Sequence, residues 1–142
     1  MVNKPKLIAI VGPTASGKTT LGIALAKKFG GEIVSADSRQ IYRGMDIGTA
    51  KPTVEERRAI CHHLIDIKDH NEDYTVADYQ RDAFAAIDDI IARGKIPLLV
   101  GGTGLYVRAV LENFNIAKTI ANPELRMRIE KRHRGCRARR SF

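Results

Sequence analysis

In residues 7–19 the apolar run Leu7-Ile8-Ala9-Ile10-Val11 leads directly into Gly12-Pro13-Thr14-Ala15-Ser16-Gly17-Lys18-Thr19. The second part fits G-x-x-x-x-G-K-[ST], the pattern of a phosphate-binding P-loop. It predicts a buried strand that ends at Val11, a loop whose backbone N–H groups face phosphate oxygens, and a helix that begins at about Gly17-Lys18. Lys18 is expected to bring a positive charge to the terminal phosphate, and the Thr19 hydroxyl to ligate Mg²⁺. The alternative, a glycine turn with a solvated lysine, requires this strand–loop–helix context to be a coincidence.

Length and composition indicate one globular domain of 142 residues with a net charge of +8. The surplus is uneven, because residues 124–142 carry 8 Lys/Arg against 2 Asp/Glu and residues 1–123 carry 16 against 14. The charge therefore does not by itself indicate a nucleic-acid-binding domain. No apolar run approaches the roughly 18 residues of a membrane span, and the N-terminus lacks a signal-peptide pattern. We expect a cytoplasmic protein without membrane association whose two cysteines, Cys61 and Cys136, are thiols.

Strand and helix patterns alternate along the chain. Strands are predicted at 6–11, 32–36, 63–67 and 96–100, and helices at 18–29, 54–60, 75–92 and 105–111. The first strand reads as continuously apolar, which is typical of a strand covered on both faces. The alternation predicts an α/β fold, namely a P-loop NTPase-like, mostly parallel sheet covered by helices on both faces.

Two carboxylates follow predicted strands and compete for a role in catalysis. Asp37 comes after the second strand, so it is expected over the P-loop at the carboxyl edge of the sheet. It can act as a general base, as a ligand of metal-bound water, or as a helix N-cap without chemical function. Asp66 is the alternative Mg²⁺ ligand at a strand end, or else a solvated residue.

Two further clusters are open to a functional or a structural interpretation. Gly101-Gly102-Thr103-Gly104 is either a tight turn or a second ligand loop, in which Thr103 offers a hydroxyl to a polar substrate. Cys61, His62, His63 and His70 suggest a metal site. However, adjacent histidines on a strand point to opposite faces and cannot share one ion without a bulge, so a structural role is favoured for them.

Five motifs coincide in order and spacing with one family. They are Gly12 to Thr19, Asp37-Ser38-Arg39-Gln40-Ile41-Tyr42, Met45-Asp46-Ile47-Gly48-Thr49-Ala50-Lys51-Pro52, His63-Leu64-Ile65-Asp66, and Pro97-Leu98-Leu99-Val100-Gly101-Gly102-Thr103-Gly104-Leu105-Tyr106. From about Lys6 to Ile129 the chain resembles the N-terminal part of the tRNA dimethylallyltransferases, also called tRNA isopentenyltransferases.

The resemblance implies transfer of a dimethylallyl group from dimethylallyl diphosphate, bound with Mg²⁺, to N6 of an adenine beside the anticodon of tRNA. By position, Asp37 matches the general base and acts with Lys18 and Thr19. The diphosphate site matches Gly12, Pro13, Thr14, Ala15, Ser16, Gly17, Lys18 and Thr19, and the residues matching the contacts to the tRNA anticodon stem-loop are Asp37, Ser38, Arg39, Gln40, Thr103 and Arg126.

The end of the chain departs from the family pattern. After Arg128-Ile129-Glu130 it runs into the arginine-rich residues 131–140 and stops. We expect an α/β core over 1–121, and over 122–142 the start of a helical RNA-binding insertion that runs into a basic, disordered tail. The sheet would then be truncated before the family's last strand, leaving an apolar edge uncovered. A shifted reading frame or early stop explains this end; a natural RNA-binding tail is the alternative.

Three functions remain open at this point. The first is the tRNA prenyltransferase, expected to be a monomer, of low or no activity if truncated. The second is a P-loop kinase for a small molecule or nucleoside, in which ATP occupies the loop, Asp66 holds Mg²⁺ and Asp37 activates a hydroxyl. The third is a non-enzymatic fragment that binds RNA through its basic tail.

Overall fold

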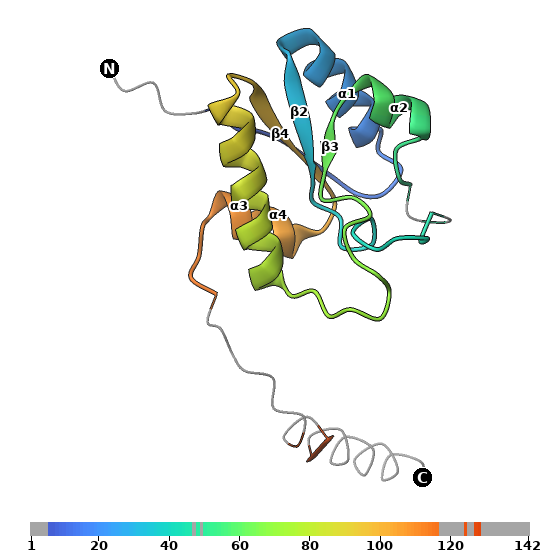
Figure 1. Ribbon diagram of the computed structural model, residues 1–142, viewed down its shortest axis with the longest axis vertical. Coiled ribbons are helices and arrows are strands. Elements are labelled where there is room, and N and C mark those ends of the chain that lie inside the picture. The colour runs from blue at the N-terminus through green and yellow to red at the C-terminus, as the bar shows by residue number, and fades with distance from the viewer. Residues whose placement is uncertain (1–5, 47, 49, 117–123, 125–126, 129–142) are drawn as a thin grey trace.

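A computed structural model of the chain describes residues 6–46, 48, 50–116, 124, 127 and 128 (Figure 1). Arg126, most of the predicted domain 122–142 and the basic run fall outside these residues. The described part forms one sheet of four parallel strands in the order β1-β4-β2-β3. The strands are β1 (Ile8–Val11), β2 (Gly31–Ser35), β3 (His62–His63) and β4 (Ile96–Gly101).

Helices cover both faces of this sheet, as predicted. They are α1 (Lys18–Phe29), α2 (Val54–Ala59), α3 (Val76–Ala92) and α4 (Gly104–Leu111). In Figure 1 the sheet stands between α1 on one side and the pair α3 and α4 on the other. The α/β class is therefore confirmed. None of the helices in the described part is long and apolar enough to cross a membrane.

Each face of the sheet has its own apolar core. Ile10, Ile23, Ala26, Ile33 and Leu98 pack between the sheet and α1. The larger core lies under α3 and α4 and is built around Tyr79, Tyr106, Val34, Leu99 and Ile90. The Tyr79 and Tyr106 rings stack with centroids 3.9 Å apart. The Tyr79 hydroxyl donates to the Ser35 carbonyl at 3.0 Å, so α3 is tied to the carboxyl end of β2.

The capping box that predicts the start of α3 is present. The Thr75 side chain accepts from the Asp78 N–H while the Asp78 carboxylate accepts from the Thr75 N–H. A second capping box, from Thr53 and Glu56, starts α2. These reciprocal bonds satisfy N–H groups that the first turn of a helix leaves unpaired. The sequence therefore predicts the start of α3 correctly.

The expectation of a first strand covered on both faces is wrong. Strand β1 lies at the edge of the described sheet and pairs only with β4. Ala9 is exposed, and the Val11 side chain is 56% exposed. A continuous apolar run shows that a strand is suited to burial, but the position of the strand depends on its neighbours.

The predicted strand at 63–67 is also wrong in extent. Strand β3 contains only His62 and His63, because Leu64 and Asp66 adopt left-handed φ values of 62° and 55°. Beyond β3 the chain bonds to a neighbouring turn instead of to β2, with the Asp66 N–H donating to the Gln40 carbonyl at 3.0 Å. The apolar residues of this segment favour a strand and give no sign of the left-handed conformations of Leu64 and Asp66. The other predicted strands and helices are confirmed, with ends that differ by one or two residues.

Candidate phosphate-binding cleft

The loop between β1 and α1 has the shape of an anion-binding turn. Gly17, with φ of 80°, immediately precedes α1, and Ala15 also lies in the left-handed region with φ of 63°. Left-handed residues of this kind turn successive backbone N–H groups toward one side. No side chain caps the start of α1, and its first turn contains no acidic residue. The first-turn N–H groups are thus left for an anion, which the helix dipole also favours.

Lys18 folds back over this loop. Its ammonium group donates to the Pro13 carbonyl and lies 3.4 Å from the Ser16 Oγ. The charge is therefore held at the mouth of the loop by polar atoms of the loop itself. An ammonium group in this position can transfer its hydrogen bonds to a phosphate oxygen of higher charge.

A single cleft joins the loop to the other strand ends. It has a volume of about 320 Å³ and is lined by residues 14–19, by Asp37 after β2, and by Gly101 and Gly102 at the carboxyl end of β4. The carboxyl ends of parallel strands meet at one edge of a sheet, which explains why these segments converge. Gln40 also lines the cleft, whereas Ser38, Arg39 and Thr103 lie outside its lining.

Asp37 combines a structural role with a free acceptor. Its Oδ1 accepts from the Arg39 N–H at 2.9 Å, which closes a turn. Within the described part of the chain no group donates to Oδ2. The carboxylate is therefore held by one oxygen, and Asp37 lines the cleft. It does not cap a helix, because residues 38–41 form a turn.

The second glycine loop holds the Asp37 turn in place. The Ser38 N–H donates to Thr103 Oγ1 at 2.9 Å, and the Thr103 N–H donates to the Ala36 carbonyl at 3.0 Å. The close approach requires a glycine at Gly101, because a Cβ there would lie 2.2 Å from the Ala36 carbonyl oxygen. The loop is therefore a brace between β2 and β4, and substrate contact by Thr103 remains a prediction.

The three other residues predicted to contact RNA differ in setting. Gln40 is buried and joined to its own surroundings, with Oε1 accepting from Ser35 Oγ at 3.0 Å and Nε2 donating to the Ala50 carbonyl at 3.2 Å. Arg39 is exposed. Arg126 lies outside the described residues. Their contacts with RNA stay predictions.

Asp66 is not arranged to hold Mg²⁺ in this cleft. Its Oδ1 accepts from Lys51 at 2.6 Å and its Oδ2 from Arg57 at 2.5 Å. Partial burial opposes ionisation, but the hydrogen bonds from these two cations hold the pKa of Asp66 below its ordinary value. Both oxygens are committed, and Asp66 does not line the cleft. The kinase hypothesis loses its proposed metal ligand.

Lys51 and His62 line the cleft, a position that the sequence did not predict for either of them. Lys51 is 3% exposed and donates to Asp46, Asp66 and the Tyr42 carbonyl, so it organises the segment that follows the Asp37 turn. His62 bonds the Ile60 carbonyl through Nδ1 at 2.8 Å, while its buried Nε2 has no partner in the described structure. Burial lowers the pKa of His62. The register of β3 against β2 places it in the cleft, and no local sequence signal predicts that register.

Comparisons with known proteins identify the family to which this chain is similar. The family model described as IPP transferase matches residues 40–140. The chain is 58% identical over 134 residues to a tRNA dimethylallyltransferase of Thermomicrobium roseum, covering 94% of this chain and 41% of that protein. It is 60% identical over 125 residues to one from Roseiflexus, covering 88% of this chain and again 41% of the relative. The chain thus spans about two fifths of the length of these relatives.

Solved structures that are similar to this chain also belong to enzymes of this kind. A tRNA isopentenylpyrophosphate transferase of Bacillus halodurans matches with a TM-score of 0.78 and 55% identity, over 90% of this chain and 42% of that one. A eukaryotic dimethylallyltransferase acting on tRNA matches with a TM-score of 0.76 and 36% identity, over 84% of this chain and 31% of that one. Together with the loop, the cleft and the position of Asp37, these matches place the chain in the IPP transferase family.

Proposed function

We propose that the cleft binds dimethylallyl diphosphate and directs transfer of its dimethylallyl group to N6 of an adenine beside the anticodon of tRNA. The observation that carries the proposal is the convergence of the phosphate loop and Asp37 on one cleft. Both sequence relatives are named for dimethylallyl transfer to tRNA, and both structural relatives are transferases of tRNA. A tRNA acceptor also favours a cytoplasmic location.

The leaving group is the first chemical problem that the cleft addresses. Breaking the allylic C–O bond leaves negative charge on the diphosphate. Lys18 and the N–H groups at the start of α1 are placed to bind that charge as it develops. Since the loop is already folded around its own hydrogen bonds, little reorganisation is needed when the charge appears.

The acceptor amine is the second problem. An adenine amine is a weak nucleophile, and as its nitrogen forms the new C–N bond it must lose a proton. In this proposal the Oδ2 atom of Asp37 takes that proton, while Oδ1 stays bonded to the Arg39 N–H. An adenine turned out of its stack reaches such a cleft at a cost in stacking energy, which contacts with the pocket offset.

The cleft also fits Mg²⁺. Thr19 and Asp37 both line it and present oxygen atoms, which are the donors that Mg²⁺ prefers, and diphosphate oxygens and water complete such sites. The ion, held by Thr19 and the diphosphate, would supply further neutralisation of the leaving group. The chain itself contributes the Thr19 hydroxyl, which it holds at the start of α1.

The proposal is tested by offering two donors in parallel to the 142-residue chain. Labelled dimethylallyl diphosphate and ATP are each incubated with Mg²⁺ and an anticodon stem-loop, and binding, label transfer and ADP release are measured. We expect saturable binding of dimethylallyl diphosphate, competed by pyrophosphate, and label in the stem-loop adenine. ADP release without prenyl transfer would instead support the kinase hypothesis. RNA binding that collapses with salt and survives Asp37→Ala, without donor binding, would support the RNA-binding fragment.

A further inference from the structure

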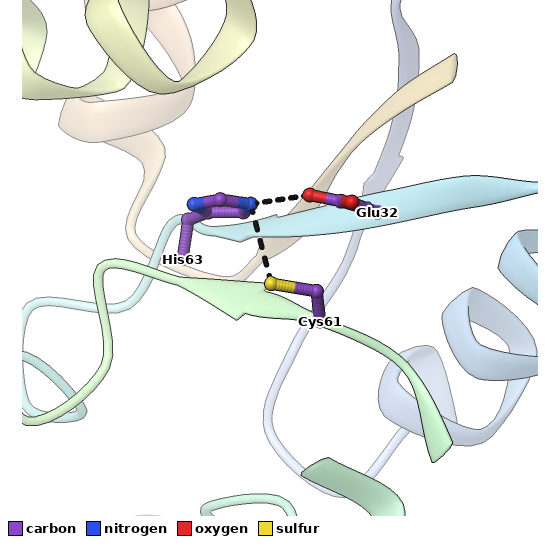
Figure 2. A group of neighbouring side chains, drawn as sticks. All are labelled: Glu32, Cys61 and His63. Atoms are coloured by element: carbon purple, nitrogen blue, oxygen red, sulfur yellow. Dashed lines mark hydrogen bonds and ion pairs between the residues drawn. The ribbon is translucent and has the colours of Figure 1, made fainter. Parts of the chain in front are cut away.

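Three side chains with metal-binding atoms converge at the edge of the sheet formed by β2 and β3. Figure 2 shows Glu32, Cys61 and His63 pointing toward one another from these two segments. The His63 Nε2 lies 2.7 Å from Glu32 Oε2 and 3.6 Å from Cys61 Sγ. All three donor atoms lie within 4.8 Å of one another.

The parallel register of the two strands produces this convergence. Ile33 pairs with His62, so Glu32 and Cys61 are neighbours across the strands. Cys61 and His63 are two residues apart, and alternate residues of an extended chain share a face. His62, between them, points instead into the phosphate cleft. The rule that adjacent histidines cannot share one ion therefore holds, but it does not apply to Cys61 with His63.

The arrangement does not suit a nucleophilic cysteine. In a Cys–His–carboxylate triad the imidazole faces the thiol with one nitrogen and the carboxylate with the other. Here the same nitrogen, Nε2, faces both groups. Burial and the Glu32 carboxylate also raise the pKa of the Cys61 thiol. Three donor atoms within 4.8 Å of one another are instead a spacing that one metal ion can bridge.

We propose that Glu32, Cys61 and His63 form a binding site for a zinc-class divalent cation, separate from the diphosphate cleft. Thiolate, imidazole and carboxylate are the ligands that Zn²⁺ takes in proteins. A tetrahedral zinc ion places a nitrogen and a sulfur ligand about 3.6 Å apart, and a nitrogen and an oxygen ligand about 3.3 Å apart. The first value matches the present geometry, and the second requires Glu32 and His63 to separate by only about 0.6 Å.

Two cations orient the carboxylate for this role. Arg93 and Lys95 donate to Glu32 Oε1 at 2.5 Å and 2.7 Å, and Arg93 also donates to Oε2 at 2.8 Å. A carboxylate offers about four lone-pair positions, so Oε2 can ligate an ion while Oε1 stays bonded to the two cations. Such supporting bonds hold a ligand in position, although the positive charges of Arg93 and Lys95 reduce the affinity for a cation.

The site is accessible from solvent. Cys61 is exposed, and together with Glu32 it lines a hollow of about 370 Å³ beside the C-terminal end of α1. Three protein ligands leave a fourth tetrahedral position for a water molecule. The ion can therefore enter without opening the core.

The test uses the reduced 142-residue chain, freed of metal with a chelator and titrated with Co²⁺ and then Zn²⁺. We expect one equivalent of Co²⁺ to produce a thiolate-to-cobalt charge-transfer band that Zn²⁺ removes. Cys61→Ser should lower affinity about 100-fold or more, and His63→Gln at least about 10-fold. Cys136→Ser and His70→Gln are the matched controls and should bind as the unchanged chain does.

A second measurement needs no variant. Iodoacetamide labelling followed by tryptic digestion reports Cys61 and Cys136 on different peptides, because Arg58 and Arg134 precede them. We expect Zn²⁺ to protect Cys61 at least about 10-fold more than Cys136. Equal protection of both thiols, or a cobalt band that survives in Cys61→Ser and disappears in Cys136→Ser, would overturn the proposal. These readouts do not depend on prenyl transfer. A negative result for the cation site would therefore not contradict the proposed prenyl transfer, and the reverse also holds.

Discussion

The Ser38 N–H donates to Thr103 Oγ1 at 2.9 Å across 65 positions of sequence. This bond joins the turn after β2 to the loop after β4, and Asp37 lies directly before Ser38. The position of the proposed base is thus fixed by a strand end that lies far from it in the chain.

Thr103→Val tests this brace, because valine keeps the side-chain shape and removes the acceptor. We expect a loss of about 1 kcal/mol in the free energy of unfolding and a fall of about 10-fold in prenyl transfer through displacement of Asp37. Denaturant unfolding and initial rates measure the two effects. Thr103→Ser keeps the hydroxyl and should retain normal stability and a normal rate. Thr20→Val makes the same change at an exposed position of α1 and is the control. Full activity in Thr103→Val would show that the hydrogen bond between Ser38 and Thr103 does not position Asp37 for catalysis.

Asp37→Asn separates the two roles of Asp37. The amide oxygen can still accept from the Arg39 N–H, so the turn and the stability should be retained, whereas the base is lost. Turnover should fall by about 100-fold or more with unchanged binding of dimethylallyl diphosphate. Asp88→Asn, at an exposed position of α3, is the control. An unaltered kcat would assign the base to another residue.

Lys18→Ala should weaken the diphosphate complex, because it removes a charge-assisted hydrogen bond. We expect inhibition by pyrophosphate to require about 10 to 100 times more inhibitor. Calorimetry with pyrophosphate and Mg²⁺ checks this value, with the exposed Lys27→Ala on α1 as the matched control. Equal pyrophosphate affinity in the two variants would contradict the assignment of the loop.

Glu32→Gln should destabilise the chain in a pH-dependent way. The side chain is 3% exposed, and the hydrogen bond from Arg93 is the largest of the effects that hold the pKa of Glu32 far below its ordinary value of 4.5. The stabilisation is therefore complete above about pH 4.5 and is lost as the pH falls below that value. We expect a loss of about 1–3 kcal/mol at pH 7 and less at pH 3.

Metal-free samples in denaturant at both pH values measure the Glu32 effect. Glu112→Gln removes an exposed carboxylate paired with Arg108 and should leave stability nearly unchanged at both pH values, because solvent screens exposed ion pairs. An equal loss for Glu32→Gln at pH 7 and pH 3 would show that the charge of Glu32 does not contribute.

His62→Gln should reduce the acid sensitivity of the fold just below neutrality. Burial lowers the pKa of His62, so the unfolded chain takes up a proton at a higher pH than the folded chain. Stability is therefore retained above the ordinary pKa of 6.5 and falls as the pH drops below it. Unfolding curves between pH 7 and pH 5 should show a smaller slope in the variant than in the unchanged chain. The exposed His70→Gln should leave that slope unaltered.

The elements of this fold whose signals are local can be predicted from the amino-acid sequence. The apolar run before Gly12, the glycines and Lys18 of the loop, and the capping box of Thr75 with Asp78 are each read within a few residues. Since parallel strands share a carboxyl edge, the sequence also placed Asp37 over the phosphate loop. These parts of the fold and site were predictable because the interactions that specify them are short in range.

Which strand ends become neighbours, and in what register the strands pair, follows from long-range contacts in the folded chain. The edge position of β1, the early end of β3 and the pairing of Asp66 with Lys51 and Arg57 depend on contacts between distant segments. The register of β2 against β3 directs His62 into the cleft and brings His63 and Cys61 to Glu32. A shift of one residue would exchange those faces, since side chains alternate along a strand. No pattern within either strand specifies that register.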